Sequence, residues 1–521
     1  MAKRFLLLGL GAMLVLASII PAAASTADDA APELTFIKNI PYANGTDLEF
    51  AEMTVSVLDA DGNPVIDPAT GQPATEQRDY AFAGTISRQI RVIDITDPPN
   101  AFVAAVIPCN VSQGDIQVRP DLGILVIGVD STTAQCGMAN SQGILIFDIS
   151  DPRTPTQLSV FKSARGAHNA TLHPTEPLVY LSDSDLGNSN LGAIPIVDIS
   201  DPTKPTLVTT FAYQAFSPHD ITFNASGNRA YAASITHSYI MDTTNPRSPS
   251  VISTIFDPAI NIHHDAKPTE DGKYLIIGDE QGGAAAGIYC PGGGLHIYDI
   301  SVEATPVKVG MYFPENFTAA KLCTAHVLQV SGTLLTMGWY TGGSYVLDIA
   351  DPRNIVQVAR ALPTGAGGNS AEANSWASKL WKGYVYSNDR NRGLDILRFD
   401  TGGTYLGAGR IKAGNPTTVV GGASELAWIN ICDGSQPPTN DVDQRLVKIP
   451  EAIGDGTHNL FLNITTPAAD AADLDVYYYD GGCGFLDAGE PGGQILAGAR
   501  YAWVNAFTGA DITFTAVARA A

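Results

Sequence analysis

The sequence predicts an all-β protein, a seven-bladed β-propeller followed by a small β-sandwich. A phrase of the type Asp-Ile-Ser-Asp-Pro recurs along the chain, and six clear copies begin at Asp94, Asp148, Asp198, Asp242, Asp299 and Asp348. Successive copies are 44 to 57 residues apart, and short apolar runs separated by turn residues fill each interval. Repeats of about this length, made of strands, are typical of propeller blades. A weaker seventh copy at residues 393–397 gives the expected blade count.

Each repeat divides into four expected strands. In residues 218–256 the inner strand covers 218–223, and three further strands cover 229–234, 238–242 and 250–256. Asx and proline residues between the third and fourth strands favour a turn there. The same frame places the starts of the seven inner strands near Thr46, Gly114, His168, His219, His264, His326 and Ser375.

Two further segments have an expected place in the propeller, an insertion in the first repeat and a strand that closes the ring. Residues 59–77 form an insertion that we interpret as an exposed hairpin, whose acidic residues fit a solvated turn better than a calcium loop. Residues 34–38 precede the first inner strand, so we expect them to supply the fourth strand of blade seven and close the ring. Residues 404–411 are the alternative for that place.

Length and composition agree with more than one domain. The chain has 521 residues, 45% of them hydrophobic, with 51 glycines and 33 prolines. Chains of this length usually contain two or more domains. We expect a signal peptide over residues 1–24, a linker over 25–32, the propeller over 33–412 and the β-sandwich over 413–521, where the repeated phrase stops and other short strands follow.

The N-terminus and the charge indicate export and exclude nucleic acid as a partner. Lys3 and Arg4 precede an apolar run to Ile20 and a stretch of small residues, which is the pattern of a secretory signal. An uncleaved anchor is the alternative, although the run is short for a bilayer span. The formal charge of -23 is opposite to what phosphate binding needs. We expect a secreted, periplasmic or cell-surface protein without a membrane span after cleavage.

The cysteines fit the same compartment. Six are present, and an even number behind a signal peptide suggests disulfides. Neighbouring pairs give three expected bridges, Cys109–Cys136, Cys290–Cys323 and Cys432–Cys483. In the propeller frame the first two would each join a loop between blades to a loop between the second and third strands, and both kinds of loop emerge on one face. By fixing these loops in place, the bridges would make the face, here called the pinned face, the wall of a binding site. The alternative is that they only stabilise long loops.

Four histidines occupy one repeated position and form the candidate metal site. His168, His219, His264 and His326 each begin an inner strand, and inner strands line the central channel. Acidic residues expected at the same mouth are Asp130, Asp183, Asp279 and Asp389. Imidazoles suit copper, iron or zinc, and carboxylates suit manganese or calcium. Asp220 and Asp265, next to two of the histidines, are candidates to orient the imidazole rings.

The alternative for these histidines is a structural repeat feature without a ligand. A repeat can reuse His-Asp to bind loop backbone in every blade. Geometry also limits the metal hypothesis, because adjacent blades of a seven-bladed ring are about 51° apart and four neighbouring histidines cover only part of the circle. Two or three of them can share an ion more easily than four.

The repeats resemble a known family. Ile-Leu-Ile-Phe-Asp-Ile-Ser-Asp-Pro at residues 144–152 and Ile-Pro-Ile-Val-Asp-Ile-Ser-Asp-Pro at residues 194–202 are similar to the LVIVD repeat of bacterial secreted and surface proteins. The resemblance spans about residues 33–412 and implies a seven-bladed propeller, with little implied about activity. Residues 218–223 and 264–275 also resemble inner strands of YncE-like and lactonase-type propellers, and the placement of histidines at a channel is similar to that in selenium-binding-protein-type thiol oxidases.

Two functions follow as hypotheses. The first is a secreted or cell-surface binding protein that presents the pinned face to a protein, glycan or small molecule. The second is a metal-dependent extracellular enzyme, oxidoreductase before hydrolase, in which His219, His264 and His326 are ligands and His168 is a fourth ligand or a proton shuttle.

Overall fold

The fold is all-β, as expected, and its strands form nine antiparallel sheets in the part of the chain that the structure describes. The computed structural model describes residues 32–111, 113–130, 135–139, 141–164, 167–183, 192–213, 218–280, 293–314, 324–411, 445–464, 474–482, 484–506 and 512–521. The expected signal peptide lies outside these residues. The helices described are three 3-10 turns, Pro98–Asn100, Pro120–Leu122 and Ala366–Gly368. None of the helices in the described ranges is long and apolar enough to cross a membrane.

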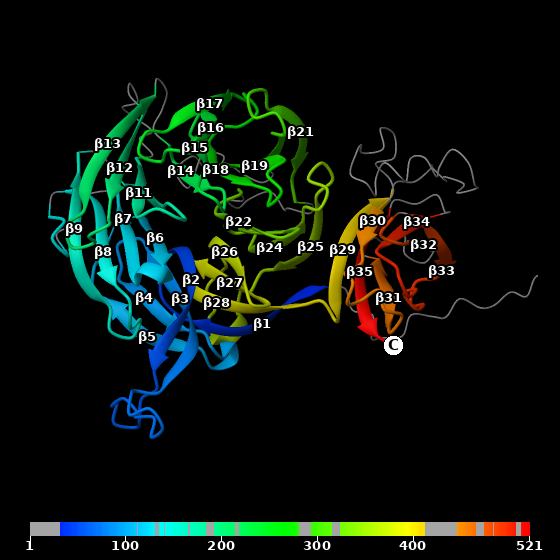
Figure 1. The fold of residues 1–521 in the computed structure, drawn as a ribbon, viewed down its shortest axis with the longest axis horizontal. Helices are drawn as coiled ribbons and strands as arrows, with labels where there is room; N and C mark the ends of the chain where they lie inside the picture. The colour runs from blue at the N-terminus through cyan, green and yellow to red at the C-terminus, as the bar shows by residue number, and fades with distance from the viewer. Residues whose placement is uncertain are drawn as a thin grey trace, which may run out of the picture.

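Seven four-stranded sheets, here called blades 1 to 7, surround a central axis (Figure 1). Blade 1 contains β2 (Gly45–Ser56), β3 (Thr75–Thr85), β4 (Ile90–Asp94) and β5 (Phe102–Ile107). Blade 2 contains β6 (Gln113–Arg119), β7 (Ile124–Val129), β8 (Gln142–Asp148) and β9 (Thr156–Ser163). Blade 3 contains β10 (Asn169–Leu172), β11 (Leu178–Ser182), β12 (Gly192–Asp198) and β13 (Thr206–Tyr213).

The remaining blades follow the same order of strands from the axis outward. Blade 4 contains β14 (Asp220–Phe223), β15 (Arg229–Ser234), β16 (His237–Asp242) and β17 (Ser250–Ile255). Blade 5 contains β18 (His263–Pro268), β19 (Tyr274–Asp279), β20 (Leu295–Asp299) and β21 (Val307–Tyr312). Blade 6 contains β22 (Leu328–Ser331), β23 (Leu334–Gly338), β24 (Ser344–Asp348) and β25 (Val356–Ala361).

Blade 7 joins the two ends of the propeller. Its strands are β26 (Ser375–Trp381), β27 (Tyr384–Asp389), β28 (Gly393–Asp400) and β1 (Glu33–Ile40). β1 pairs antiparallel with β28 from Glu33 opposite Asp400 to Ile40 opposite Leu394. The N-terminal strand therefore takes the outer place in blade 7, as expected. Because that edge of β28 is occupied, β29 (Thr404–Ile411), which falls inside the range expected for the propeller, pairs with β35 (Ile512–Ala520).

The repeated Asp-Ile-Ser-Asp-Pro phrase is explained by the turn between the third and fourth strands. The carboxylate of Asp148 accepts the N–H of Ser150 at 2.8 Å, and that of Asp198 accepts the N–H of Ser200 at 2.8 Å. The second aspartate of the phrase repeats this contact, since Asp151 accepts the N–H of Arg153 at 3.0 Å. Such Asx contacts hold a turn. The phrase therefore has a structural role on the outer part of each blade.

The C-terminal unit contains two further sheets. The first has the order β29-β35-β31, with β31 at His458–Ile464. The second has the order β30 (Arg445–Lys448), β34 (Tyr501–Ala506), β32 (Leu474–Tyr479) and β33 (Phe485–Gly489). Val447, Val476 and Val504 of the second sheet share one buried cluster with Leu460 and Phe514 of the first.

The C-terminal unit contacts blade 6 through a buried carboxylate. Asp348, at the end of β24, is 2% exposed. The hydroxyl of Tyr405 donates to its Oδ2 at 2.7 Å, and the N–H of Ala408 donates to the same oxygen at 3.1 Å. Both donors belong to β29, so one aspartate of the repeated phrase also attaches the C-terminal unit to the propeller.

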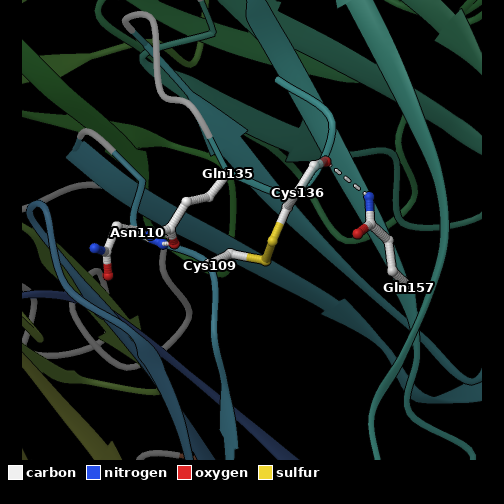
Figure 2. The surroundings of a disulfide bond; sticks show 5 residues. All are labelled: Cys109, Asn110, Gln135, Cys136 and Gln157. Carbon is white, nitrogen blue, oxygen red and sulfur yellow. Dashed lines mark hydrogen bonds between the residues drawn. A yellow bond between two sulfur atoms is a disulfide. The ribbon is translucent and has the colours of Figure 1, made fainter. Parts of the chain in front are cut away.

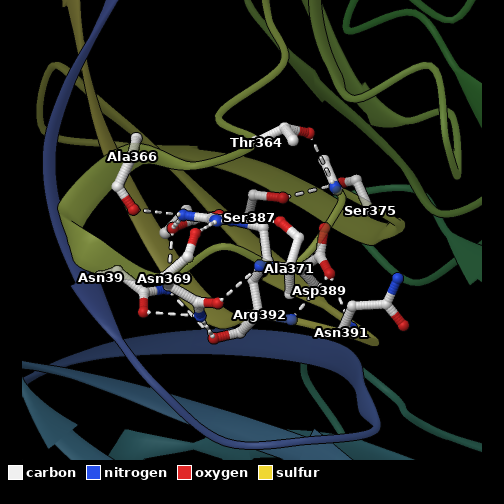
Figure 3. Close-up of polar contacts among 12 residues, drawn as sticks. Asn39, Thr364, Ala366, Asn369, Ala371, Ser375, Ser387, Asp389, Asn391 and Arg392 are labelled. Carbon is white, nitrogen blue, oxygen red and sulfur yellow. Dashed lines mark hydrogen bonds and ion pairs between the residues drawn. The ribbon is translucent and has the colours of Figure 1, made fainter.

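A buried arginine organises the closure of the ring (Figure 3). Arg392 is fully buried and forms a two-point ion pair with Asp395, at 2.6 and 2.9 Å. Its guanidinium also donates to the carbonyls of Asn369 and Ala366, at 2.7 and 3.1 Å. The side chain of Asn39 on β1 donates to the carbonyl of Arg392 at 3.0 Å. This network connects β28, the loop before β26 and the N-terminal strand.

One of the expected disulfides is confirmed (Figure 2). Cys109 and Cys136 are bonded, with their Cα atoms 5.8 Å apart. The side chain of Gln135 accepts the N–H of Asn110 at 2.6 Å, and Gln157 donates to the carbonyl of Cys136 at 3.0 Å. The bridge joins the β5–β6 loop to the β7–β8 loop. The other four cysteines, Cys290, Cys323, Cys432 and Cys483, lie outside the described residues.

Replacement of Arg392 tests the closure network. Arg392→Leu leaves Asp395 buried without its counter-ion, so we expect a loss of about 3 to 5 kcal/mol in the free energy of unfolding. Arg398→Leu is the matched control on β28, the strand that directly follows Arg392. Arg398 and Asp400 are 49% and 39% exposed, and such pairs contribute under about 1 kcal/mol. Urea unfolding of both variants checks this, and equal midpoints for the two would contradict the role of Arg392.

Removal of the disulfide tests the pinned loops. The bridge spans 27 residues, for which loop-closure entropy gives a stabilisation of about 3 to 4 kcal/mol. The double variant Cys109→Ser, Cys136→Ser avoids a free thiol and leaves the other cysteines in place. We expect its thermal midpoint to fall by several degrees in a calorimetric scan, and an unchanged midpoint would show that the two loops are held by other contacts.

Candidate functional site

The inner strands bring one ring of side chains to the mouth of the channel. His168 precedes β10, His219 precedes β14, His264 lies in β18 and His326 precedes β22. The ring centroids of His168 and His219 are 4.3 Å apart, those of His219 and His264 are 4.0 Å apart, and those of His264 and His326 are 4.2 Å apart. Trp376 of β26 continues the series, 4.3 Å from His326. The four repeated histidines are therefore one continuous cluster, here called the histidine cluster.

Glu280 contacts the cluster from the end of the second strand of blade 5, next to the inner strand that carries His264. This residue directly follows β19, and its Oε2 lies 3.5 Å from Nε2 of His264. Its Oε1 lies 3.7 Å from Nε2 of His326 and accepts the hydroxyl of Tyr340 at 2.7 Å. Tyr340 is 1% exposed and has a φ of 42°. A left-handed φ is uncommon for a bulky residue and is often found where surrounding structure holds a functional group in place.

The hydrogen bonds of His326 determine which nitrogen is available. Its Nδ1 lies 3.0 Å from the carbonyl oxygen of Trp376. A carbonyl only accepts, so Nδ1 carries the proton and the neutral ring presents the lone pair of Nε2. That lone pair faces the carboxylate of Glu280. Two acceptors face one another at this point, an arrangement that a shared proton or a cation stabilises.

His168 is arranged differently. Its Nδ1 lies 3.1 Å from Oδ2 of Asp130, and its Nε2 lies 3.1 Å from Nε2 of Gln113. The carboxylate accepts from Nδ1, so the other nitrogen accepts from the amide of Gln113. The lone pair of His168 is thereby occupied. This residue lies at the edge of the cluster, and Asp130 orients it.

Burial keeps the inner imidazoles neutral. The pKa of His219 and that of His264 are far below the ordinary value, first because of burial and then because of the neighbouring histidines. Burial lowers the pKa of His326 to about 3. Burial raises the pKa of Glu280 to about 7, although the hydroxyl of Tyr340 opposes that rise. The neutral imidazole is the form in which histidine binds metals, whereas Glu280 would have to lose its proton to act as a ligand.

Three of these residues have donor atoms close enough to hold one ion. Single donor atoms of His219, His264 and Glu280 all lie within 4.8 Å of one another, and all three side chains are buried. Nδ1 of His219 and Nδ1 of His264 are buried and have no hydrogen-bond partner among the described residues. Of the four histidines predicted from the sequence, two belong to this group, His326 contacts it through Glu280, and His168 flanks it.

The acidic residues predicted for the mouth have mostly structural partners. Asp279 accepts the N–H groups of Asn261 and Ile262 at 3.1 and 3.0 Å. Asp389 accepts the N–H of Asn374 at 2.5 Å. Asp183 lies directly after β11 and is partly exposed. Of the four, Asp130 contacts a histidine of the cluster, His168.

Among the described residues, Asp220 and Asp265 contact a lysine rather than an imidazole. Both contact Lys267, whose Nζ lies 3.4 Å from Asp220 and 2.9 Å from Asp265. Asp265 also accepts the N–H of Leu328 in the next blade at 3.0 Å. Strand geometry explains the difference, because a residue next to a histidine in an extended chain points away from it. These aspartates therefore connect neighbouring inner strands.

Glu280 was missed by the sequence reasoning. The frame assigned the channel-mouth acid of blade 5 to Asp279, the last residue of β19, while the residue after it reaches the cluster. The signal was the adjacent pair of acids at the strand end, Asp279 and Glu280. Choosing between them requires the course of the chain after the strand, which no repeat pattern specifies.

A polar cavity of about 270 Å³ lies against the cluster within the channel. His219, His264 and His326 contribute to its wall together with Trp376. The rest of the wall is mostly polar and comes from the inner strands, and it includes Thr46, Asp47, Glu49, Gln113, Asp115, Gln117, Asn169, Thr171, Asp220, Thr222, Lys267 and Lys379. A small molecule in this cavity can reach the histidine side chains.

His296 is a buried histidine outside the histidine cluster, in blade 5. His296 is 1% exposed, and its Nδ1 lies 2.9 Å from Nζ of Lys308. The same ammonium donates to Asp257 at 2.6 Å, and the hydroxyl of Tyr298 donates to Asp257 at 2.5 Å. Burial, followed by the charge of Lys308, lowers the pKa of His296 to about 4.

The lowered pKa of His296 predicts a loss of stability in acid. The unfolded chain takes up a proton near pH 6.5 while the folded protein does not until about pH 4. The contribution of His296 is therefore complete above pH 6.5 and falls by about 3 kcal/mol as the pH drops to 4. In His296→Gln the stability curve should be flatter over this range. Urea unfolding at several pH values checks this, and parallel curves for both proteins would contradict it.

One family model matches a short part of the chain. The model of the LVIVD repeat matches residues 192–212, which cover β12 and most of β13. No curated protein matches the chain significantly. Among solved structures, the periplasmic gluconolactonase PpgL of Pseudomonas aeruginosa is 13% identical with a TM-score of 0.48, covering 61% of this chain and 92% of its own. The Cps50 (Swd1) β-propeller domain of Myceliophteria thermophila is 11% identical with a TM-score of 0.45, covering 70% of this chain and 100% of its own. At these values the two likenesses carry no argument. The chain carries the LVIVD repeat within an all-β propeller.

Proposed function

We propose that the protein is a metal-dependent enzyme that acts outside the cytoplasm, with a transition metal held by His219, His264 and Glu280 and with His326 as a further ligand. The observation that carries the proposal is the convergence of the three donor atoms within 4.8 Å inside a buried site. A purely structural repeat of histidines does not require a carboxylate from a different strand of the blade to meet them.

Electrostatics supports a cation at this point. Nε2 of His326 presents a lone pair to Oε1 of Glu280 at 3.7 Å, and Glu280 is also 3.5 Å from His264. Without a proton or a cation, these acceptors repel one another in a buried site of low polarity. A metal ion would accept all of these lone pairs together.

Neighbouring residues would hold the ligands in position. The carbonyl of Trp376 holds the proton of His326 on Nδ1, and the hydroxyl of Tyr340 holds Glu280. Metal-binding histidines commonly donate their other N–H to a carbonyl or carboxylate in this way. Tyr340 is therefore a positioning residue.

The donor types favour zinc or iron over calcium. Two imidazoles and one carboxylate are found in catalytic zinc sites and in non-haem iron(II) sites, whereas calcium takes oxygen ligands almost exclusively. A metal of this kind supplies Lewis acidity and an activated water or, for iron, redox chemistry. The cavity of about 270 Å³ beside the histidines would place a small substrate next to it.

The location outside the cytoplasm is part of the proposal. The Cys109–Cys136 disulfide supports it, because structural disulfides persist in oxidising compartments. The alternative role, recognition of a protein, glycan or small molecule by the pinned face, rests on the same disulfide. The histidine cluster favours the enzyme, since recognition by surface loops does not need buried donor atoms inside the channel.

Metal analysis of the protein tests the proposal. Untagged protein, stripped with a chelator, incubated with zinc or iron(II) and desalted, should retain close to one ion per chain by elemental analysis. Glu280→Gln keeps the side-chain size and an acceptor for Tyr340 but removes the charge, so metal affinity should fall at least about tenfold. His219→Ala with His264→Ala should abolish retention.

His458→Ala is the control, because His458 lies in the C-terminal unit and has no contact with the cluster. It should retain the metal as the wild type does. Circular dichroism and thermal midpoints would show that each variant is folded. The absence of retained metal in the wild type, or equal affinity in Glu280→Gln, would refute the metal site.

A further inference from the structure

We propose that the channel cavity next to the histidine cluster binds a small molecule that carries a protonated amine, with Asp115 as the counter-ion. Asp115 is not one of the proposed metal ligands, although His219 and His264 line the same cavity, and the inference does not depend on the metal. The evidence is the charge balance of the cavity wall and the surroundings of Asp115.

Carboxylates outnumber cations in the wall of the cavity. Four carboxylates line it, Asp47, Glu49, Asp115 and Asp220, against the two ammonium groups of Lys267 and Lys379. A fifth carboxylate, Asp265, contacts Lys267 from behind the wall. These groups come from the inner strands β2, β6, β14, β18 and β26, so they surround the channel.

Both lysines are already neutralised. Lys379 lies 3.0 Å from Asp47 and 2.8 Å from Glu49, and Lys267 lies 2.9 Å from Asp265 and 3.4 Å from Asp220. Burial opposes the charge of each ammonium, but the two carboxylates at each lysine outweigh burial and raise its pKa. The lysines are therefore held as permanent cations, and each one is shared by two acids.

Asp115 has no cation of its own. It is 8% exposed, and its Oδ2 accepts the N–H of Ala170 at 2.7 Å. Within the described part of the chain, Asp115 makes no ion pair with a lysine or arginine. Burial first, and then the neighbouring charge of Asp47, raise its pKa well above the ordinary value. The N–H of Ala170 and the more distant charge of Lys379 oppose that rise in pKa but do not outweigh it. The carboxylate thus lines the cavity without a cation in direct contact among the described residues.

The surroundings of the cavity favour a positively charged ligand over a negatively charged one. An anion would meet an excess of carboxylates in a buried space, where repulsion is strong. A protonated amine would form an ion pair with Asp115 and lower the repulsion between Asp115, Asp47 and Asp220. The amides of Gln113, Gln117 and Asn169 and the hydroxyls of Thr46 and Thr171 also line the cavity and can bind the polar remainder of the molecule.

A series of ligands that differ only in charge tests the inference. The metal-free protein, treated with chelator, is titrated calorimetrically with 4-aminobutan-1-ol, butane-1,4-diol and 4-hydroxybutyrate. We expect the amine to bind at least about tenfold more tightly than the diol, and the acid to show no binding. In Asp115→Asn the advantage of the amine over the diol should disappear, while the amide oxygen still accepts from Ala170.

Asp121→Asn is the matched control. Asp121 follows the same inner strand, β6, but its side chain is 60% exposed and pairs with Arg119 at the surface. This variant should bind the amine as the wild type does. Equal binding of the diol or the acid, no binding of the amine, or unchanged amine affinity in Asp115→Asn would each overturn the inference. Calcium binding that depends on Asp115, without amine binding, would overturn it as well. Because no metal is present, failure here leaves the metal proposal untouched.

Discussion

The pairing of β1 with β28 is the constraint on which the rest of the molecule depends. Seven blades enclose a channel only if the last is joined to the first, and this chain achieves the closure with its N-terminal strand in blade 7. Arg392 strengthens the junction from inside, since its guanidinium and carbonyl connect β28, the loop before β26 and Asn39 of β1. The same pairing leaves β29 free to join the C-terminal sheet, and Asp348 then attaches that unit to blade 6.

Closure also creates the unusual electrostatics of the channel. Inner strands from all blades face one axis, so polar side chains that would be solvated on an open sheet become buried beside one another. The outcome is a cluster of neutral imidazoles around Glu280 and, next to it, a cavity wall rich in carboxylates with two lysines. Groups of this kind are costly to bury unless partners compensate them. The two proposals for this channel, a metal at Glu280 and an amine at Asp115, each provide such compensation.

The repeats made much of this architecture predictable. The recurring aspartate marks a turn because its carboxylate accepts the N–H two residues later. Each copy of the phrase therefore indicates where the third strand of a blade ends. The alignment of the inner strands that follows from this phrase predicted that the four histidines lie at the same level of the channel. The role of each histidine and of its neighbours could not be predicted in the same way. His168 is occupied by Gln113, and Asp220 and Asp265 contact Lys267 because adjacent residues of a strand point in opposite directions.

The sequence alone determined the all-β class, the repeat frame and the shared position of the four histidines on the inner strands, because these depend on local periodicity and on turn chemistry. It favoured residues 34–38 as the closing strand but left residues 404–411 as an alternative, and the structure decided between them. The tertiary structure decided which donor atoms meet. Glu280 reaches His264 and His326 through the course of the chain after β19, Tyr340 reaches Glu280 from blade 6, and the carbonyl of Trp376 in blade 7 sets the tautomer of His326. These contacts join residues distant in the sequence, and their geometry depends on the rotation between blades, which no single repeat encodes.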